Sequence, residues 1–385
     1  MNPMPVEPFS LPFSQSAVND LRGRLARTRW PDEIPSSAWE YGFSLAFLQD
    51  ICRYWKDQFD WKAQIGSLSH LHHFRFTRGA HAIHFIHERG QGPNPLPLIL
   101  THGWPGSFLE MLEILPLLTD PASHGADPAD AFHVVIPSLP GYGFSDPPIE
   151  RGVNTFVIAD LWAELMSALR YPRFAAQGGD IGAAVTTLLG LRHPDHLVAI
   201  HLNYIPGSYR PWLPPGATLT PEEQASVADT ARWYDEHGAY AHLQRTHPQT
   251  PAIALNDSPA GLAAWILEKF REWSDCNGDL LSRFTRDELL ANVTLYWMTQ
   301  TIASSFRLYM EGRLAPLQFR ENDFVSVPTG VARFPIEDPF PIRPWVERGY
   351  NLQRWTEMPR GGHFAAAEEP ALLAEEIRQF FRPYR

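Results

Sequence analysis

An aspartate stands at a predicted turn between a strand and a helix, within Gly178–Gly182, which reads Gly-Gly-Asp-Ile-Gly. Small residues on both sides of Asp180 permit a sharp turn, the strained geometry that exposes a nucleophilic side chain. A serine at this place would attack an acyl carbon, whereas a carboxylate forms an alkyl ester when it opens a strained or activated C–O or C–halogen bond. The residue type of Asp180 therefore predicts the class of reaction.

A histidine and an acid follow Asp180 in the order that a nucleophile, an acid and a base require. His363 lies in Arg-Gly-Gly-His-Phe, between the last predicted strand and the closing helix. Its partner must hold the imidazole in one tautomer, and the preceding loop offers Glu337 and Asp338, of which we prefer Glu337. Each residue alone is more often a turn or a solvated loop residue. Only the ordered set of three predicts catalysis.

The loop His102–Pro105 follows a predicted strand, where a backbone N–H is needed for the oxyanion of an ester. The N–H groups of Trp104 and Ile181 are our candidates for this oxyanion hole. The alternative is an ordinary Gly-Pro loop in which Trp104 simply packs, and a cis bond before Pro105 would favour a specialised loop. We expect a structural role for the His102 side chain.

The elements that must position these residues alternate between apolar strands and helical patterns, which is typical of a mostly parallel α/β sheet covered by helices. Residues 70–87 change to short-period alternation and predict an antiparallel hairpin at the sheet edge. The expected later elements are strands at Leu98–Thr101, Val134–Pro137, Phe174–Gln177, Leu197–Asn203, Val325–Pro328 and Tyr350–Thr356, and a closing helix at Leu372–Phe381.

Four segments are expected along the chain. Residues 1–69 have a helical pattern and predict an N-terminal helical lobe, and residues 70–205 hold the first part of the core. The strand rhythm stops over 206–320, where helical stretches such as Gly261–Trp273 predict an inserted cap. Residues 321–385 complete the core.

The composition excludes several other classes of protein. The 385 residues are 44% hydrophobic and carry 32 basic against 43 acidic side chains, a net charge of −11 that argues against nucleic acid as a partner. Only Cys52 and Cys276 are present, so we expect neither a disulfide framework nor a cysteine zinc site, in keeping with a cytoplasmic location. We expect no signal peptide, because the N-terminal residues lack a basic region followed by an apolar stretch, and no membrane anchor, because no segment approaches ~18 uninterrupted apolar residues. Whether the chain forms a homo-oligomer stays open.

Six histidines between residues 70 and 87 raise the question of a metal site. Strand alternation would place His70 and His72 on one face, but no Asp or Cys joins them at ligand spacing. We therefore expect the hairpin to account for them without a metal. The full set is His70, His72, His73, His81, His84 and His87.

Several segments form a recognisable set. His102–Phe108 reads His-Gly-Trp-Pro-Gly-Ser-Phe, and Gly141–Ser145 reads Gly-Tyr-Gly-Phe-Ser. These two segments and those around Asp180 and His363 resemble the microsomal epoxide hydrolase family. The resemblance extends to Pro8–Ser10 and Thr28–Glu33 near the N-terminus, so it covers nearly the whole chain.

This resemblance implies an α/β-hydrolase fold with a helical lid and a two-step hydrolysis of a small-molecule epoxide by water. Asp180 would form the ester, and His363, oriented by Glu337, would activate water against it. Tyr240 and Tyr309 match the two lid tyrosines that hydrogen-bond the epoxide oxygen in that family. The chemistry requires neither a metal nor an organic cofactor.

The chain departs from the family pattern in two ways. Ile181 replaces the aromatic residue that often follows the nucleophile, which leaves the backbone donor intact but changes a wall of the pocket. We also expect no N-terminal membrane helix of the kind that microsomal members carry, so the chain resembles the soluble microbial branch.

Two other functions use the same fold. A haloalkane dehalogenase would employ the same three residues, but it needs halide donors, commonly a Trp beside the nucleophile, and the side chain of Ile181 cannot donate. A ligand-binding protein with the hydrolase fold and no activity is the other alternative. Release of halide from an alkyl halide would identify the dehalogenase, and ligand binding without turnover of epoxides would identify the inactive protein.

Overall fold

A nine-stranded sheet forms the centre of the protein, whose computed structural model describes residues 6–385. Its strand order is β1-β2-β3-β5-β4-β6-β7-β8-β9, antiparallel from β1 to β5 and parallel from β5 to β9. The strands are β1 (Val6–Pro8), β2 (His73–Arg78), β3 (His81–Glu88), β4 (Leu96–Thr101), β5 (Phe132–Pro137), β6 (Phe174–Gly178), β7 (Leu197–Leu202), β8 (Val325–Arg333) and β9 (Tyr350–Glu357).

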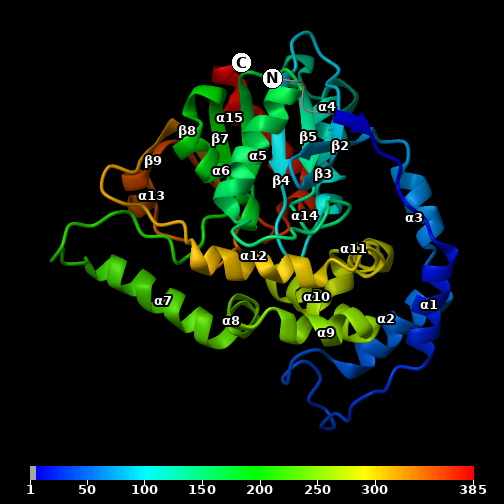
Figure 1. The fold of residues 1–385 in the computed structure, drawn as a ribbon. Coiled ribbons are helices and arrows are strands. Elements are labelled where there is room, and N and C mark those ends of the chain that lie inside the picture. Colours follow the sequence, from blue (N-terminus) through cyan, green and yellow to red (C-terminus); the bar gives the residue numbers. More distant parts are fainter. Residues whose placement is uncertain (1–5) are drawn as a thin grey trace.

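The predicted helix-covered, mostly parallel sheet is confirmed. Central strands such as β4, β5 and β6 are almost continuously apolar because helices cover both of their faces. In Figure 1, α5 and α6 lie on one face of the sheet, and α4 and α15 pack together on the other. The core helices are α4 (Ile114–Thr119), α5 (Thr155–Ala168), α6 (Asp180–Arg192), α13 (Arg343–Gly349), α14 (Ala365–Glu368) and α15 (Pro370–Phe381).

Helices α7 to α12 separate β7 from β8 and lie together across one end of the sheet (Figure 1). The helix predicted around Gly261–Trp273 is α10, and Ser258 caps it by accepting a hydrogen bond from Gly261 N, with Pro259 in the first turn. The six helices are α7 (Pro221–His237), α8 (Ala239–Thr246), α9 (Gln249–Asp257), α10 (Pro259–Trp273), α11 (Arg286–Thr299) and α12 (Ile302–Leu314).

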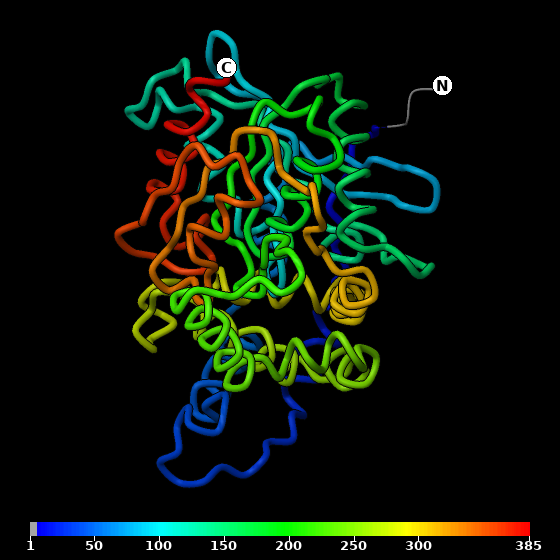
Figure 2. Tube along the Cα trace, turned by 90° about the vertical axis from the view of Figure 1, so that its left-hand side faces the viewer, coloured from blue at the N-terminus to red at the C-terminus, as the bar shows by residue number. Residues whose placement is uncertain are grey.

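The sequence predicted a helical lobe for the N-terminal segment, but the described part of this segment begins with a short strand. Strand β1 pairs antiparallel with β2 and becomes the edge of the sheet in place of the predicted hairpin. Three helices follow, α1 (Gln15–Ala26), α2 (Leu45–Asp57) and α3 (Trp61–Leu68). Trp55 Nε1 donates to Thr294 Oγ1 of α11 at 2.8 Å, which joins this segment to the α7–α12 layer. Figure 2 shows the loop between α1 and α2 extending beyond that layer.

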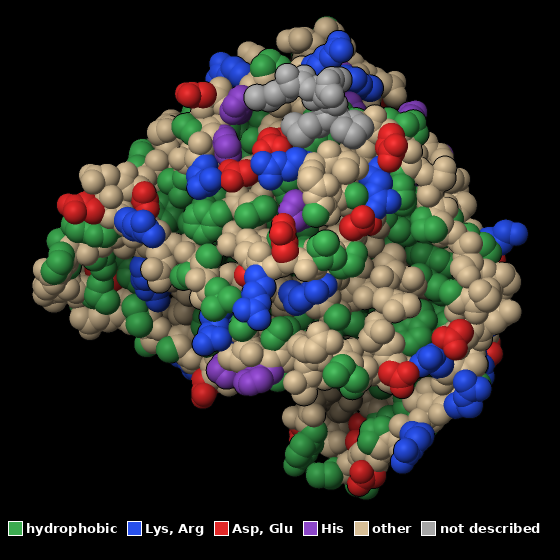
Figure 3. All heavy atoms as spheres, viewed as in Figure 1, with side chains coloured by type: hydrophobic (Ala, Val, Ile, Leu, Met, Phe, Trp, Pro, Cys, Tyr) green, Lys and Arg blue, Asp and Glu red, His purple; other side chains and the backbone are tan. Residues whose placement is uncertain are grey.

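The surface mixes both signs of charge. Figure 3 shows basic and acidic side chains interspersed with apolar ones over one face of the molecule. Within residues 6–385, none of the helices combines the length and the apolar character that crossing a membrane requires.

The predicted hairpin is confirmed as β2 and β3, but its histidines are placed differently from the expectation. His70 and His72 precede β2, because α3 continues to Leu68 and the chain is still turning there, so strand alternation does not apply to them. His73 and His84 face each other, with Nδ1 of the first 2.9 Å from Nε2 of the second. In the described part of the chain, no three metal-ligating side chains are gathered as a metal site.

One buried histidine predicts how stability depends on pH. His201 of β7 is fully buried against Phe380 and Phe381, and neither ring nitrogen has a hydrogen-bond partner among the described residues. Burial lowers the pKa of His201 from 6.5 to about 4. Below pH 6.5 the His201 imidazole binds a proton in the unfolded chain but stays neutral in the folded protein. The free energy of unfolding therefore decreases as the pH falls toward 4.

We expect His201→Leu to weaken this pH dependence. Between about pH 7 and about pH 5, the free energy of unfolding should fall by about 2 kcal/mol less than in the wild type. Urea unfolding at both pH values measures the difference. The exposed His247→Leu serves as the matched control, and equal pH slopes for His201→Leu and the wild type would contradict the prediction.

Candidate active site

Asp180 lies at the sharp turn where β6 ends and α6 begins. Its φ of 48° is left-handed, an unusual conformation for a residue other than glycine and one that concentrates at functional sites. A Cβ at Gly103 would collide with the Asp180 carboxylate, which explains why the facing loop carries glycine there. The predicted strand–turn–helix therefore exists, and it presents a carboxylate.

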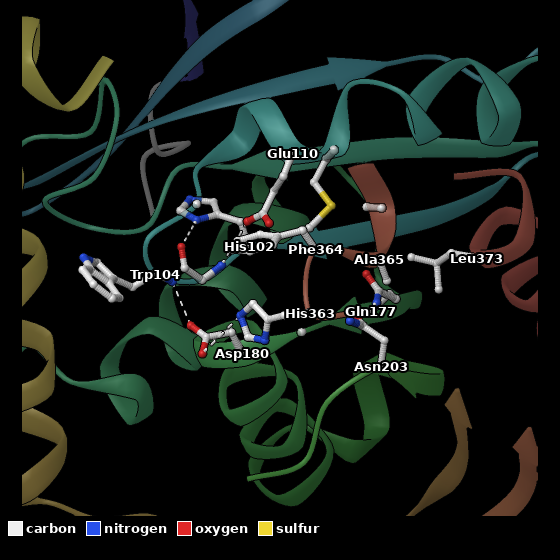
Figure 4. Close-up of a pocket in the computed structure, with 15 residues that line it drawn as sticks. His102, Trp104, Glu110, Gln177, Asp180, Asn203, His363, Phe364, Ala365 and Leu373 are labelled. Carbon is white, nitrogen blue, oxygen red and sulfur yellow. Dashed lines mark hydrogen bonds and ion pairs between the residues drawn. The ribbon is translucent and has the colours of Figure 1, made fainter. Parts of the chain in front are cut away.

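Both oxygens of Asp180 have defined neighbours. Trp104 N–H donates to Oδ1 at 2.8 Å, and His363 Nε2 lies 3.8 Å from Oδ2 (Figure 4). The peptide bond between Trp104 and Pro105 is cis. Ile181 N–H belongs to the first turn of α6, where backbone donors have no acceptor within the helix, and the Ile181 side chain packs against the core. One carboxylate oxygen is thus held by the backbone and the other faces the imidazole.

Glu337 holds the opposite side of His363. The Nδ1 atom lies 3.0 Å from both Glu337 oxygens, whereas the neighbouring Asp338 is exposed and pairs with Arg333. Burial alone would lower the pKa of His363, but the charge and hydrogen bond of Glu337, with the charge of Asp180, outweigh it and raise the pKa to about 9. The imidazole is therefore protonated at neutral pH.

The loops that carry these residues are held by the α7–α12 layer. His363 N–H donates to the carbonyl of Trp273 at the end of α10, at 2.9 Å, and a Cβ at Gly362 would collide with that carbonyl. On the other loop, Asn292 Nδ2 donates to Pro105 O and Tyr296 Oη to Gly106 O, both at 2.8 Å. The geometry around Asp180 thus depends on contacts with α10 and α11.

Tyr240 and Tyr309 come from α8 and α12 and meet above Trp104. The Tyr240 ring stacks on the Trp104 ring at 5.3 Å, and the Tyr309 ring stands edge-on to it at 5.9 Å. Burial first, and then the negative charge of Asp180, raises the pKa of Tyr240 well above its usual value. Burial and Tyr240, followed by Asp180, do the same for Tyr309. Both hydroxyls therefore keep their protons and can donate them in hydrogen bonds.

The sequence reasoning missed one acid beside this site. Glu110 lies in the short helical turn Phe108–Met111 and, with Asp180 and His363, lines a cavity of about 20 Å³, enough for one water molecule (Figure 4). Burial raises the pKa of Glu110 to about 8. An acid among the apolar residues Phe108, Leu109 and Met111 was the available signal.

The arrangement suits nucleophilic attack by Asp180 followed by hydrolysis. Among the described residues, no backbone N–H donates to Oδ2, whereas Oδ1 is placed to become the carbonyl oxygen of an ester held by Trp104 N–H. An imidazole anchored by an acid is the usual means of activating water. The site therefore holds the groups needed for both forming and cleaving an ester.

Known proteins are similar to this chain in both sequence and fold. Two sequence families match the chain, "Epoxide hydrolase N terminus" over residues 6–111 and "alpha/beta hydrolase fold" over residues 97–370. A protein of Stigmatella aurantiaca assigned as an epoxide hydrolase is 46% identical, covering 99% of this chain and 86% of that protein. "Epoxide hydrolase 1" of Oryctolagus cuniculus is 39% identical, covering 97% of this chain and 88% of that protein.

Solved structures agree with the sequence comparisons. The Aspergillus niger epoxide hydrolase superposes with a TM-score of 0.86 at 28% identity, covering 100% of this chain and 97% of that one. The juvenile hormone epoxide hydrolase of Bombyx mori gives 0.83 at 29% identity, covering 99% and 94%. The predicted α/β-hydrolase fold is thereby confirmed.

Proposed function

The chain belongs to the epoxide hydrolase family, enzymes that hydrolyse small-molecule epoxides, and we propose that it does so through an ester formed on Asp180. One observation carries the proposal above all others. Oδ1 of Asp180 accepts the Trp104 N–H, while Oδ2 faces an imidazole that Glu337 anchors. A carboxylate held in this way is suited to attack a ring carbon through Oδ2 and to bear an oxyanion on Oδ1.

In the first step, Asp180 Oδ2 bonds to an epoxide carbon as the C–O bond of the ring breaks. The hydroxyls of Tyr240 and Tyr309 donate to the ring oxygen, and one proton passes to the alkoxide that forms there. Their raised pKa values keep these protons in place until that charge develops. The product is a hydroxyalkyl ester of Asp180.

In the second step, His363 removes a proton from a water molecule that attacks the Asp180 carboxyl carbon. Ester formation removes the negative charge of Asp180, which is one of the causes of the raised His363 pKa, so the imidazole moves toward its neutral, basic form. Trp104 N–H and Ile181 N–H hold the oxyanion on Oδ1. The Cγ–Oδ2 bond then breaks, and His363 returns the proton to Oδ2, which leaves as a hydroxyl of the vicinal diol. The second proton of the water passes to the tyrosinate left by the first step, which restores both the Asp180 carboxylate and the tyrosine.

The fate of the water oxygen tests this route. In a single turnover in ¹⁸O water with enzyme in excess, we expect the label in the carboxyl group of Asp180 and an unlabelled diol, since water attacks the ester and not the epoxide. Mass spectrometry of the peptide that contains Asp180 and of the diol measures both. A labelled diol in the first turnover, with no label in the peptide, would overturn the proposal.

A further inference from the structure

Two cavities of very different size share one lining side chain, which packs against His363. The smaller one, about 30 Å³, is lined by Asp180, Tyr240 and His363 and has room for about two water molecules. The larger one, about 370 Å³, lies beside α6 and the segment that leaves β7, and falls within the size range of ligand sites. It is lined mainly by apolar side chains, among them Ala183, Ala184, Ile205, Leu213, Leu317 and Phe319.

Tyr204 is the one side chain, among the residues described, that lines both cavities. Its ring stands edge-on to the imidazole of His363, with centroids 5.8 Å apart and an angle of 78° between the planes. The half-buried Tyr204 lies directly beyond β7, and its hydroxyl makes no hydrogen bond to another described residue. The ring is therefore held by packing alone and forms a wall between the two spaces.

The small cavity cannot contain a substituted epoxide by itself. An epoxide ring bonded to Asp180 would fill it, so any large substituent needs adjoining space. The cavity beside Glu110 also borders Asp180 and His363 but measures only about 20 Å³, whereas the apolar cavity behind Tyr204 is large enough. Apolar walls favour an apolar substituent because its transfer out of water is favourable.

We propose that Tyr204 determines substrate size, and that the apolar cavity behind it is a subsite for the long or bulky apolar substituent of an epoxide. This inference rests on the proposed function of Asp180 and His363. The Tyr204 ring restricts passage from the reacting carbon into the subsite. Its removal joins the two cavities and extends the substrate range toward terminal epoxides with long alkyl chains.

The test compares propylene oxide with the terminal epoxide of octene in the wild type, Tyr204→Ala and Tyr204→Phe. We expect Tyr204→Ala to raise the ratio of kcat/KM for the octene epoxide over propylene oxide by about tenfold or more. Tyr204→Phe should leave the ratio unchanged, since it keeps the ring. Because Tyr204 also contacts His363, its truncation can slow both reactions, and a ratio measured within one variant cancels that loss.

A second substitution fills the subsite from α6, which carries Ala184. Ala184→Phe should leave hydrolysis of propylene oxide unchanged and should cancel the gain when combined with Tyr204→Ala, because Ala184 lines only the larger cavity. An unchanged ratio in Tyr204→Ala, or a gain that survives Ala184→Phe, would overturn the inference. A wild type that hydrolyses neither epoxide would instead count against the proposed function.

Discussion

Alanine in place of Asp180 should reduce diol formation by roughly 10⁴-fold or more, because the substitution removes the oxygen that forms the ester. The Trp104 N–H that holds Oδ1 would lose its acceptor, and the remaining groups could at most aim water directly at the epoxide. Steady-state diol formation, measured by chromatography, gives the size of the loss. Asp195→Ala, at an exposed aspartate, is the matched control and should keep full activity.

The same variant offers a readout besides activity. The charge of Asp180 is one cause of the His363 pKa of about 9, so its removal should lower that pKa, which NMR titration of the histidine detects. A cooperative thermal transition, measured on the same Asp180→Ala protein, would show that the variant is folded and that the lowered pKa of His363 is not the result of unfolding. Diol formation at the wild-type rate would remove Asp180 from the mechanism.

The sequence predicted those parts of the fold that depend on local patterns. The parallel strands are apolar along their length because both faces are covered, so their positions could be inferred from hydropathy alone. The turn at Asp180 was predictable since small residues flank it. The chain order of Asp180, Glu337 and His363 then predicted that the three meet, and Glu337 lies 3.0 Å from His363.

Features that depend on distant packing were not predictable in this way. Strand β1 has three residues, two of them Glu and Pro, and exists because β2 offers it an edge. Glu110 lines a cavity with Asp180 and His363 only because its loop folds toward them, which no spacing in the sequence indicates. The position of Tyr204 between two cavities was also not predictable, because the walls of these cavities come from separate parts of the chain.

Glutamine in place of His363 should separate the two chemical steps. Asp180, Tyr240 and Tyr309 remain available, so the epoxide ring still opens, but glutamine cannot take a proton from water. The ester should therefore accumulate at one epoxide per protein, and steady-state turnover should fall by roughly 10³-fold or more. Intact-protein mass spectrometry should show a gain equal to the mass of the epoxide, located on the peptide that contains Asp180.

The controls for this prediction follow from the order of the steps. His247→Gln, at an exposed histidine between α8 and α9, should show full turnover and no stable adduct. The double variant Asp180→Ala, His363→Gln should show no adduct at all, because the attacking oxygen is absent. If His363→Gln turned over like the wild type, His363 would not be the base that activates water. If it lost turnover without any adduct, its part would lie in ring opening, and the pairing of His363 with Oδ2 at 3.8 Å would have to serve the first step.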